Sequence, residues 1–192
     1  MKKVIFSFVM IATAFVSNAQ DGFSKGSKFL SGNFGISSSD NKDEVTKTSS
    51  FSVNPSVGYF ISDNLAVGVG LGIGSNKVTV DGDTESESST MSFGGFGRYY
   101  FSPKSKFTMF GHLGVNYNSS DEKVADFKTT GIEAFVAPGF NYWISNKLAL
   151  EAVIGKIGYS TSKADFDGAE SSSNFDFGLN LSSISFGMVM KF

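Results

Sequence analysis

The chain has 192 residues, 22 Gly, 21 Phe, no cysteine and a formal net charge of −2. This length suits one domain, and the lack of cysteine excludes a disulfide scaffold, thiolate metal sites and a cysteine nucleophile. The near-neutral charge argues against a nucleic-acid partner. A hydrophobic fraction of 41% is too high for a disordered tail.

The first 19 residues have the pattern of a cleaved signal peptide. Two lysines follow Met1, an uncharged apolar stretch covers residues 4–16, and the small residue Ala19 ends the segment. The stretch is short for a transmembrane helix, which needs about 20 residues. We therefore predict export, with residues 1–19 removed and residues 20–192 forming the mature domain. A buried N-terminal helix or strand is the alternative.

The rest of the chain alternates between large apolar and small residues with period two, which is typical of β-strands. The clearest case is residues 65–74, where Leu, Val and Ile alternate with Ala and Gly. Tight turns and long polar segments alternate between the strands, as in an up-and-down meander. We expect eight strands, at about 27–37, 50–61, 65–75, 90–101, 107–117, 130–143, 148–159 and 176–192. Long loops are expected at 38–49, 76–89, 118–129 and 160–175.

An internal repeat relates two of the expected hairpins. The segment from Pro55 to Ala66 matches the segment from Pro138 to Ala149, with Pro, Tyr, Ile, Ser, Leu and Ala at equivalent positions. Convergent hairpin chemistry and duplication of a half-barrel both explain the match. The two prolines conflict with the strand assignment, because proline removes a donor from the ladder. Bulges or local breaks would accommodate them.

The charge distribution predicts which face of the strands is outward. A soluble, lipocalin-type barrel needs a charged exterior, but the only charged residue between Phe51 and Gly74 is Asp63, in a turn. The small Gly, Ala, Ser and Asn face therefore suits a narrow lumen, and the large apolar face, with most of the Phe, suits lipid. The predicted fold class is all-β, an eight-stranded antiparallel up-and-down transmembrane β-barrel, whose closure pairs every backbone group in the membrane.

Aromatic residues beside the short turns and beside the long loops predict girdles at both membrane interfaces. The predicted members at the short turns are Tyr59, Tyr99, Tyr100, Phe101, Tyr142 and Trp143, and those at the long loops are Tyr117 and Tyr159.

The signal peptide, the eight strands and three strand ends together resemble a known family. The strand ends are Pro-Ser-Val-Gly-Tyr-Phe at 55–60, Arg-Tyr-Tyr-Phe at 98–101 and the terminal Met-Lys-Phe at 190–192. They look like small outer-membrane β-barrel proteins of Gram-negative bacteria, of the OmpA/OmpX or porin-like type. The resemblance implies location in the outer membrane, with short turns in the periplasm and long loops outside the cell. It also implies membrane lipid and lipopolysaccharide as partners, and a barrel-assembly machinery that reads Phe192.

Strand parity directs four ionisable side chains into the lumen: Arg98, His112, Glu133 and Glu151. Arg98 and Glu151 are each about four residues from a short turn, so they should share one depth. We predict an ion pair between them, because an unpaired charge in a narrow interior is costly. Separate hydration is the alternative. A filled interior would make the barrel a plug, since eight strands leave room only for side chains.

No pattern in the sequence favours catalysis, and no cofactor is expected. His112 is the single histidine, and parity places it in the lumen, away from lipid substrates. The acids at 81–83 and 165–168 lack the ligand spacing of a calcium loop, so we interpret them as solvated. The predicted function is an integral outer-membrane barrel with a structural or surface-interaction role and no identified ligand. A narrow channel for small solutes is the alternative, and a lipid-modifying enzyme that depends on His112 is a third hypothesis.

Overall fold

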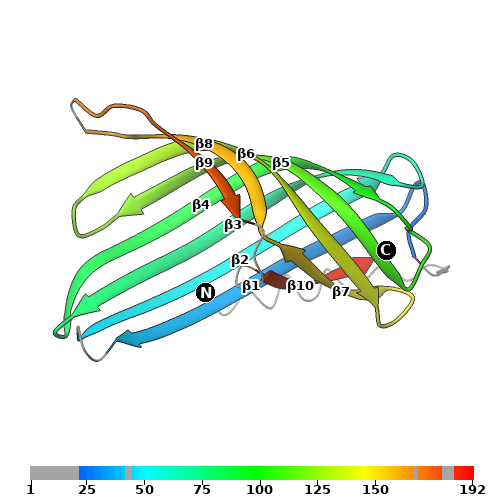
Figure 1. Ribbon diagram of the computed structural model, residues 1–192, viewed down its shortest axis with the longest axis horizontal. Helices are drawn as coiled ribbons and strands as arrows, with labels where there is room; N and C mark the ends of the chain where they lie inside the picture. The colour runs from blue at the N-terminus through cyan, green and yellow to red at the C-terminus, as the bar shows by residue number, and fades with distance from the viewer. Residues whose placement is uncertain (1–21, 42–44, 167, 179–183) are drawn as a thin grey trace.

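A computed structural model describes residues 22–41, 45–166, 168–178 and 184–192, and the predicted signal peptide lies outside this range. The described chain forms a closed antiparallel barrel (Figure 1). Each strand from β1 to β6 pairs with the next, and β10 pairs with β1 to close the ring. The strands are β1 (Lys28–Asn41), β2 (Thr46–Phe60), β3 (Leu65–Val80), β4 (Asp83–Tyr100), β5 (Phe107–Glu122), β6 (Phe127–Trp143), β7 (Leu148–Ile154), β8 (Lys156–Ala164), β9 (Ser172–Gly178) and β10 (Ile184–Lys191).

The ten strands form an eight-stranded barrel, because two of the barrel strands are each divided into two segments. β7 and β8 both pair with β6, and Gly155 separates them with a φ of 58°. The pairing with β6 shifts by one residue there, from Gly139 opposite Val153 to Val136 opposite Ile157. β9 pairs with β8, and β10 pairs with β7. The predicted eight-stranded antiparallel barrel is therefore confirmed. Among the described residues, no helix is long and apolar enough to cross a membrane.

The strands are longer than the alternation predicted, so the expected loops were partly wrong. β4 has 18 residues, whereas about 9–11 cross a bilayer. Only Asp81 and Gly82 lie between β3 and β4, with φ values of 51° and 93°. Such a turn follows the natural twist of paired strands. Most of the segment 76–89 therefore continues the ladder, and so do most of 38–49 and 118–129 and the ends of 160–175.

The large apolar side chains face outward, as the alternation predicted. On β3, Leu71 is 58% exposed, whereas Ala66, which faces the lumen, is fully buried. The Phe residues are divided between the two faces, however. Several of their rings fill the lumen, and a glycine stands beside each of them because a methyl group there would overlap the ring. These pairs are Phe29 with Gly58, Phe96 with Gly68, Phe110 with Gly139 and Phe135 with Gly114.

Both strand prolines lie where one ladder is interrupted. Pro55 pairs with Gly32 of β1, but the β2–β3 ladder has no pair at Pro55 or at the residue before it. Pro138 pairs with Gly111 of β5, and on its other side it faces the break at Gly155. The missing proline N–H groups therefore coincide with gaps in pairing, as the prediction of local breaks required.

The internal repeat encodes the same turn twice. The backbone N–H groups of Ile61 and Ser62 donate to the carbonyl of Leu65, at 2.9 and 3.2 Å. The equivalent groups of Ile144 and Ser145 donate to the carbonyl of Leu148, at 2.9 and 3.1 Å. In each turn the serine hydroxyl also accepts the N–H of the leucine at 3.1 Å.

The lumen glycines generate a stability prediction. A Cβ on Gly58 would lie 2.2 Å from the Phe29 ring, so Gly58→Ala should destabilise the barrel by about 1–3 kcal/mol. Gly111→Ala is a matched control, because no atom lies within 4 Å of the added methyl group, and its effect should stay within about 0.5 kcal/mol. Urea unfolding of the refolded barrel measures both values. Equal stability of the two variants would contradict the packing described here.

Candidate functional site

An aromatic layer closes the barrel at the end that carries the short turns. Phe23, which precedes β1, is 1% exposed and stacks on Phe60 at 4.4 Å between ring centroids. Its ring also meets Trp143 at 4.9 Å and Tyr100 at 5.2 Å. Its backbone N–H donates to the carbonyl of Pro103 at 2.7 Å, which anchors the N-terminal segment across the opening. Sequence reasoning missed Phe23, because it lies in a short polar segment outside any alternating pattern.

Six of the eight predicted girdle residues face outward, and Tyr100 and Trp143 do not. Tyr59, Tyr99, Phe101 and Tyr142 are 44–65% exposed. Trp143 is 4% exposed and belongs to the aromatic layer inside the barrel, so its assignment to the girdle was wrong. Adjacent residues of a strand point to opposite faces, so Tyr142 and Trp143 cannot both be outward.

A buried ion pair lies directly above the aromatic layer. Arg98 Nη1 donates to Glu151 Oε2 at 2.6 Å, and Arg98 Nη2 donates to Glu151 Oε1 at 3.2 Å. The side chains are 6% and 7% exposed. Arg98 Nε donates to His112 Nδ1 at 2.9 Å. The Asn141 amide, oriented to satisfy its hydrogen bonds, donates to Glu151 Oε2 at 3.1 Å. The structure thus joins three of the four predicted lumen residues in one network.

Aromatic rings surround this network on several sides. The Arg98 guanidinium carbon lies 4.8 Å from the centroid of the Phe110 ring and 5.1 Å from that of Phe96. His112 is stacked between Phe96 at 5.1 Å and Phe135 at 5.3 Å. Cations attract the faces of such rings, most strongly where water is excluded. The rings, the cation and the carboxylate thus pack against one another inside the lumen.

Glu133, the fourth predicted lumen residue, forms a separate pair. Its carboxylate accepts a hydrogen bond from Lys156 Nζ, and its side chain is 15% exposed. A cavity of about 470 Å³ lies beside this pair, with Phe135, Ala137 and Asp176 in its lining. Sequence reasoning missed Lys156, because the extra residue at Gly155 reverses the parity of the strand after that point.

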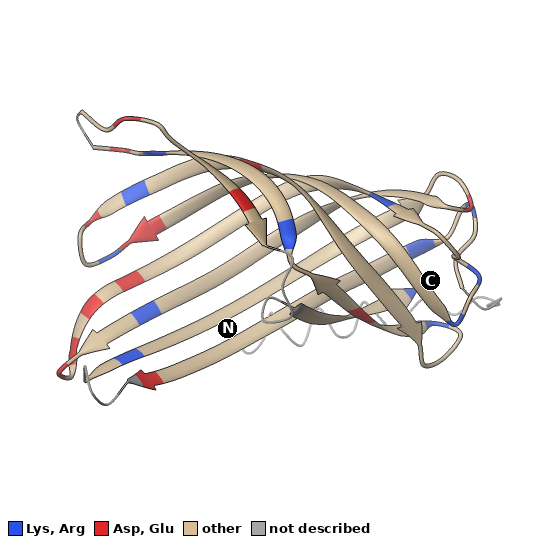
Figure 2. Ribbon diagram, viewed as in Figure 1, with Lys and Arg blue, Asp and Glu red and all other residues tan. Residues whose placement is uncertain are grey.

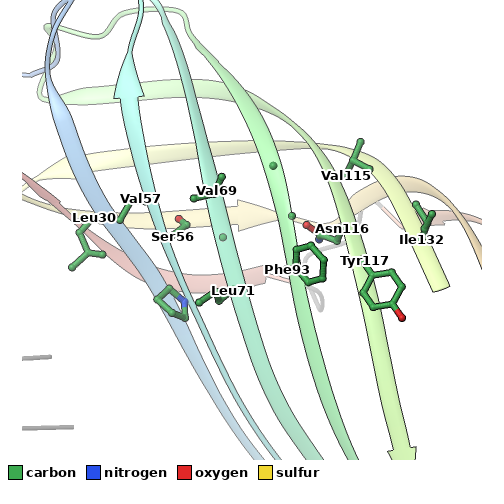
Figure 3. A pocket seen from close by; sticks show the side chains of 14 residues that line it. Leu30, Ser56, Val57, Val69, Leu71, Phe93, Val115, Asn116, Tyr117 and Ile132 are labelled. Carbon is green, nitrogen blue, oxygen red and sulfur yellow. The ribbon is translucent and has the colours of Figure 1, made fainter. Parts of the chain in front are cut away.

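A second hollow lies on the outer face of the barrel. It is an apolar groove of about 680 Å³ that runs between two rows of outward side chains on neighbouring strands (Figure 3). Its lining includes Val69, Leu71, Phe93 and Tyr117, all of them exposed on the outside. These exposed side chains place the groove on the outer surface of the barrel.

Hydrogen-bonded charges hold the far ends of β4 and β5 together, at the end with the long loops. The Glu122 carboxylate accepts the Glu87 N–H at 2.9 Å and the Ser86 hydroxyl at 2.9 Å, and these bonds lower the pKa of Glu122. Lys123 donates to Glu87 at 2.5 Å, which lowers the pKa of Glu87 and raises that of Lys123.

In the described part of the chain, no three His, Asp or Glu side chains gather as a metal site requires. Asp167 lies outside the described residues.

Glu151→Gln should destabilise the barrel by about 3–5 kcal/mol, because it leaves a buried guanidinium without a counter-charge. Urea unfolding of the refolded barrel measures the loss. The double variant Arg98→Met with Glu151→Leu removes both charges and should recover most of the stability. Unchanged stability of Glu151→Gln would show that the two groups do not depend on each other.

The Glu87–Glu122 cluster should lose order in acid. Both carboxyl groups have lowered pKa values in the folded protein. Their contribution to the stability of this end of the barrel is therefore present above about pH 5 and is lost as the pH falls through those values. Hydrogen exchange at the Glu87 amide, corrected for its intrinsic rate, should show protection that disappears toward pH ~3. A Glu122→Gln variant should lack this pH dependence, and a persistent dependence would contradict the assignment.

Known families and structures agree with this architecture. Residues 6–192 match the model of the outer membrane protein beta-barrel domain. The crystal structure of the outer membrane protein OprG from Pseudomonas aeruginosa is similar over 91% of this chain and 99% of that one, with 18% identity and a TM-score of 0.58. Neisserial surface protein A is similar over 86% and 96% of the two chains, with 18% identity and a TM-score of 0.47. No curated protein matches the sequence. Because the family match covers nearly the whole sequence, the chain belongs to the outer membrane protein β-barrel domain family.

Proposed function

We propose that this protein is an integral outer-membrane barrel that does not conduct, and that it has a structural or surface-interaction role. The filled lumen is the observation that carries the proposal. Phe23 and its neighbours occlude the short-turn end, and the Arg98–Glu151 pair lies above them, 6–7% exposed. An eight-stranded barrel is just wide enough for its side chains, and we expect this packing to leave no continuous path for water.

The segments predicted as long loops, which are mostly strand extensions, form the end of the barrel that would meet an external partner. The segments predicted as long loops contain six Lys and thirteen Asp or Glu. Figure 2 shows acidic residues gathered at this end of the barrel. The OmpA/OmpX-type resemblance supports an extracellular position for these loops. Export through the predicted signal peptide, residues 1–19, is part of the same proposal.

The position of His112 supports a non-enzymatic role. Its ring is stacked between Phe96 and Phe135, and its Nδ1 accepts a hydrogen bond from Arg98. A lipid-modifying hydrolase would need this histidine beside a nucleophile that lipid can reach. The lumen position keeps the ring away from the lipid face.

Planar-bilayer recording tests the proposal against the narrow-channel alternative. The wild-type barrel, with folding checked by heat-modifiable gel migration, should give no steady openings. The double variant Phe23→Ala with Arg98→Ala removes side-chain volume from the aromatic layer and from the ion-pair network. It should give openings if these two layers block the lumen. Steady openings of the wild-type protein would overturn the non-conducting assignment and favour the channel.

A further inference from the structure

The end of the barrel with the short turns is basic. Its charged residues in the described chain are six lysines and a single acid, Asp63. Figure 2 shows this end in contrast to the acidic end with the long loops. The lysines are Lys25, Lys28, Lys104, Lys106, Lys147 and Lys191.

Two of these lysines line a pocket between neighbouring turns. The pocket has a volume of about 270 Å³ and lies between the turn that holds Lys104 and Lys106 and the turn that holds Ser145 and Asn146. The backbone N–H of Trp143 donates to the Lys106 carbonyl at 2.9 Å, and this bond joins the two turns. The buried Thr108 hydroxyl donates to the carbonyl of Ser105 at 2.9 Å and fixes the first turn. The pocket is therefore formed before any ligand arrives.

The lining offers hydrogen-bond donors and no carboxylate. Lys104 and Lys106 supply two ammonium groups, and Lys104 Nζ also forms an exposed ion pair with Asp63 at 3.7 Å. The Ser145 hydroxyl accepts the N–H groups of Lys147 and Leu148, so its own proton is available to an anion. Trp143 also lines the pocket, but its indole N–H is buried and is not among the donors that the pocket exposes. This donor set suits a phosphate group.

The outer side of the pocket is apolar. Ile144 lines it and is 51% exposed on the outer surface. The neighbouring girdle residue Tyr142 is 44% exposed, and Lys106 Nζ lies 5.3 Å from the centroid of its ring. Aromatic rings and lysines of this kind lie at the level of lipid headgroups. A ligand here would have its charge in the pocket and its tail along the outer face of the barrel.

We propose that this pocket binds the phosphate of an anionic phospholipid headgroup in the membrane surface at the short-turn end. The inference rests on the proposed insertion of the barrel in a membrane. It assigns the lysines of this pocket a local role beyond the general attraction between a basic surface and anionic lipid.

Native mass spectrometry of the detergent-solubilised full chain tests the site, with phosphatidylglycerol as the probe and phosphatidylcholine for comparison. The wild type should retain one phosphatidylglycerol, and Lys104→Gln with Lys106→Gln should weaken its retention about tenfold or more. Lys25→Gln with Lys28→Gln makes the same change of charge at the same end, outside the pocket, and should retain the lipid. Heat-modifiable migration shows that each variant is folded.

Four results would overturn the proposal. Equal loss in both pairs of variants would indicate general attraction to a basic surface. Equal retention of phosphatidylcholine, or no lipid retained by the folded wild type, would exclude an anionic-lipid site. Displacement of the lipid by millimolar inorganic phosphate would assign the pocket to a soluble anion. None of these results bears on conductance, so failure of this site is distinguishable from failure of the proposed function.

Discussion

Closure of the backbone ladder is the constraint on which the rest of this structure depends. A ring of eight strands leaves an interior with room only for side chains, and that interior must be filled without overlap. The chain meets part of this requirement by placing a glycine beside four of the rings that enter the lumen, as Gly58 stands beside Phe29 and Gly139 beside Phe110. The frequent Gly and Phe of the composition are therefore two parts of one packing solution.

The same narrow space explains the chemistry of the lumen. A buried charge is tolerated only with a counter-charge and further hydrogen bonds, and Arg98 has the bidentate Glu151 carboxylate together with His112. The faces of Phe96 and Phe110 replace part of the water that the guanidinium loses. Phe23 then covers the network from the short-turn end. Charge pairing and aromatic packing thus lie next to each other in the lumen.

Parity along the strands was enough to predict the barrel, its outward face and the juxtaposition of Arg98 with Glu151. Parity failed to predict side-chain direction where an extra residue interrupts the two-residue alternation, and it gave no signal outside the strands. Lys156 follows the extra residue at Gly155, so its true direction is opposite to the predicted one. Phe23 precedes the first strand, and no periodic signal marks it. The predicted strands were also too short, because paired strands continue into polar sequence up to tight turns such as Asp81–Gly82.

Thiol accessibility tests the closed lumen most directly, because the natural chain has no cysteine to interfere. Ala66 faces the lumen beside Arg98 and is fully buried, whereas Asn118 lies farther toward the long loops. With the barrel in lipid vesicles, a small charged thiol reagent should modify Asn118→Cys readily and leave Ala66→Cys unmodified. Modification of both cysteines at similar rates would show that water passes through the network, and it would contradict the account.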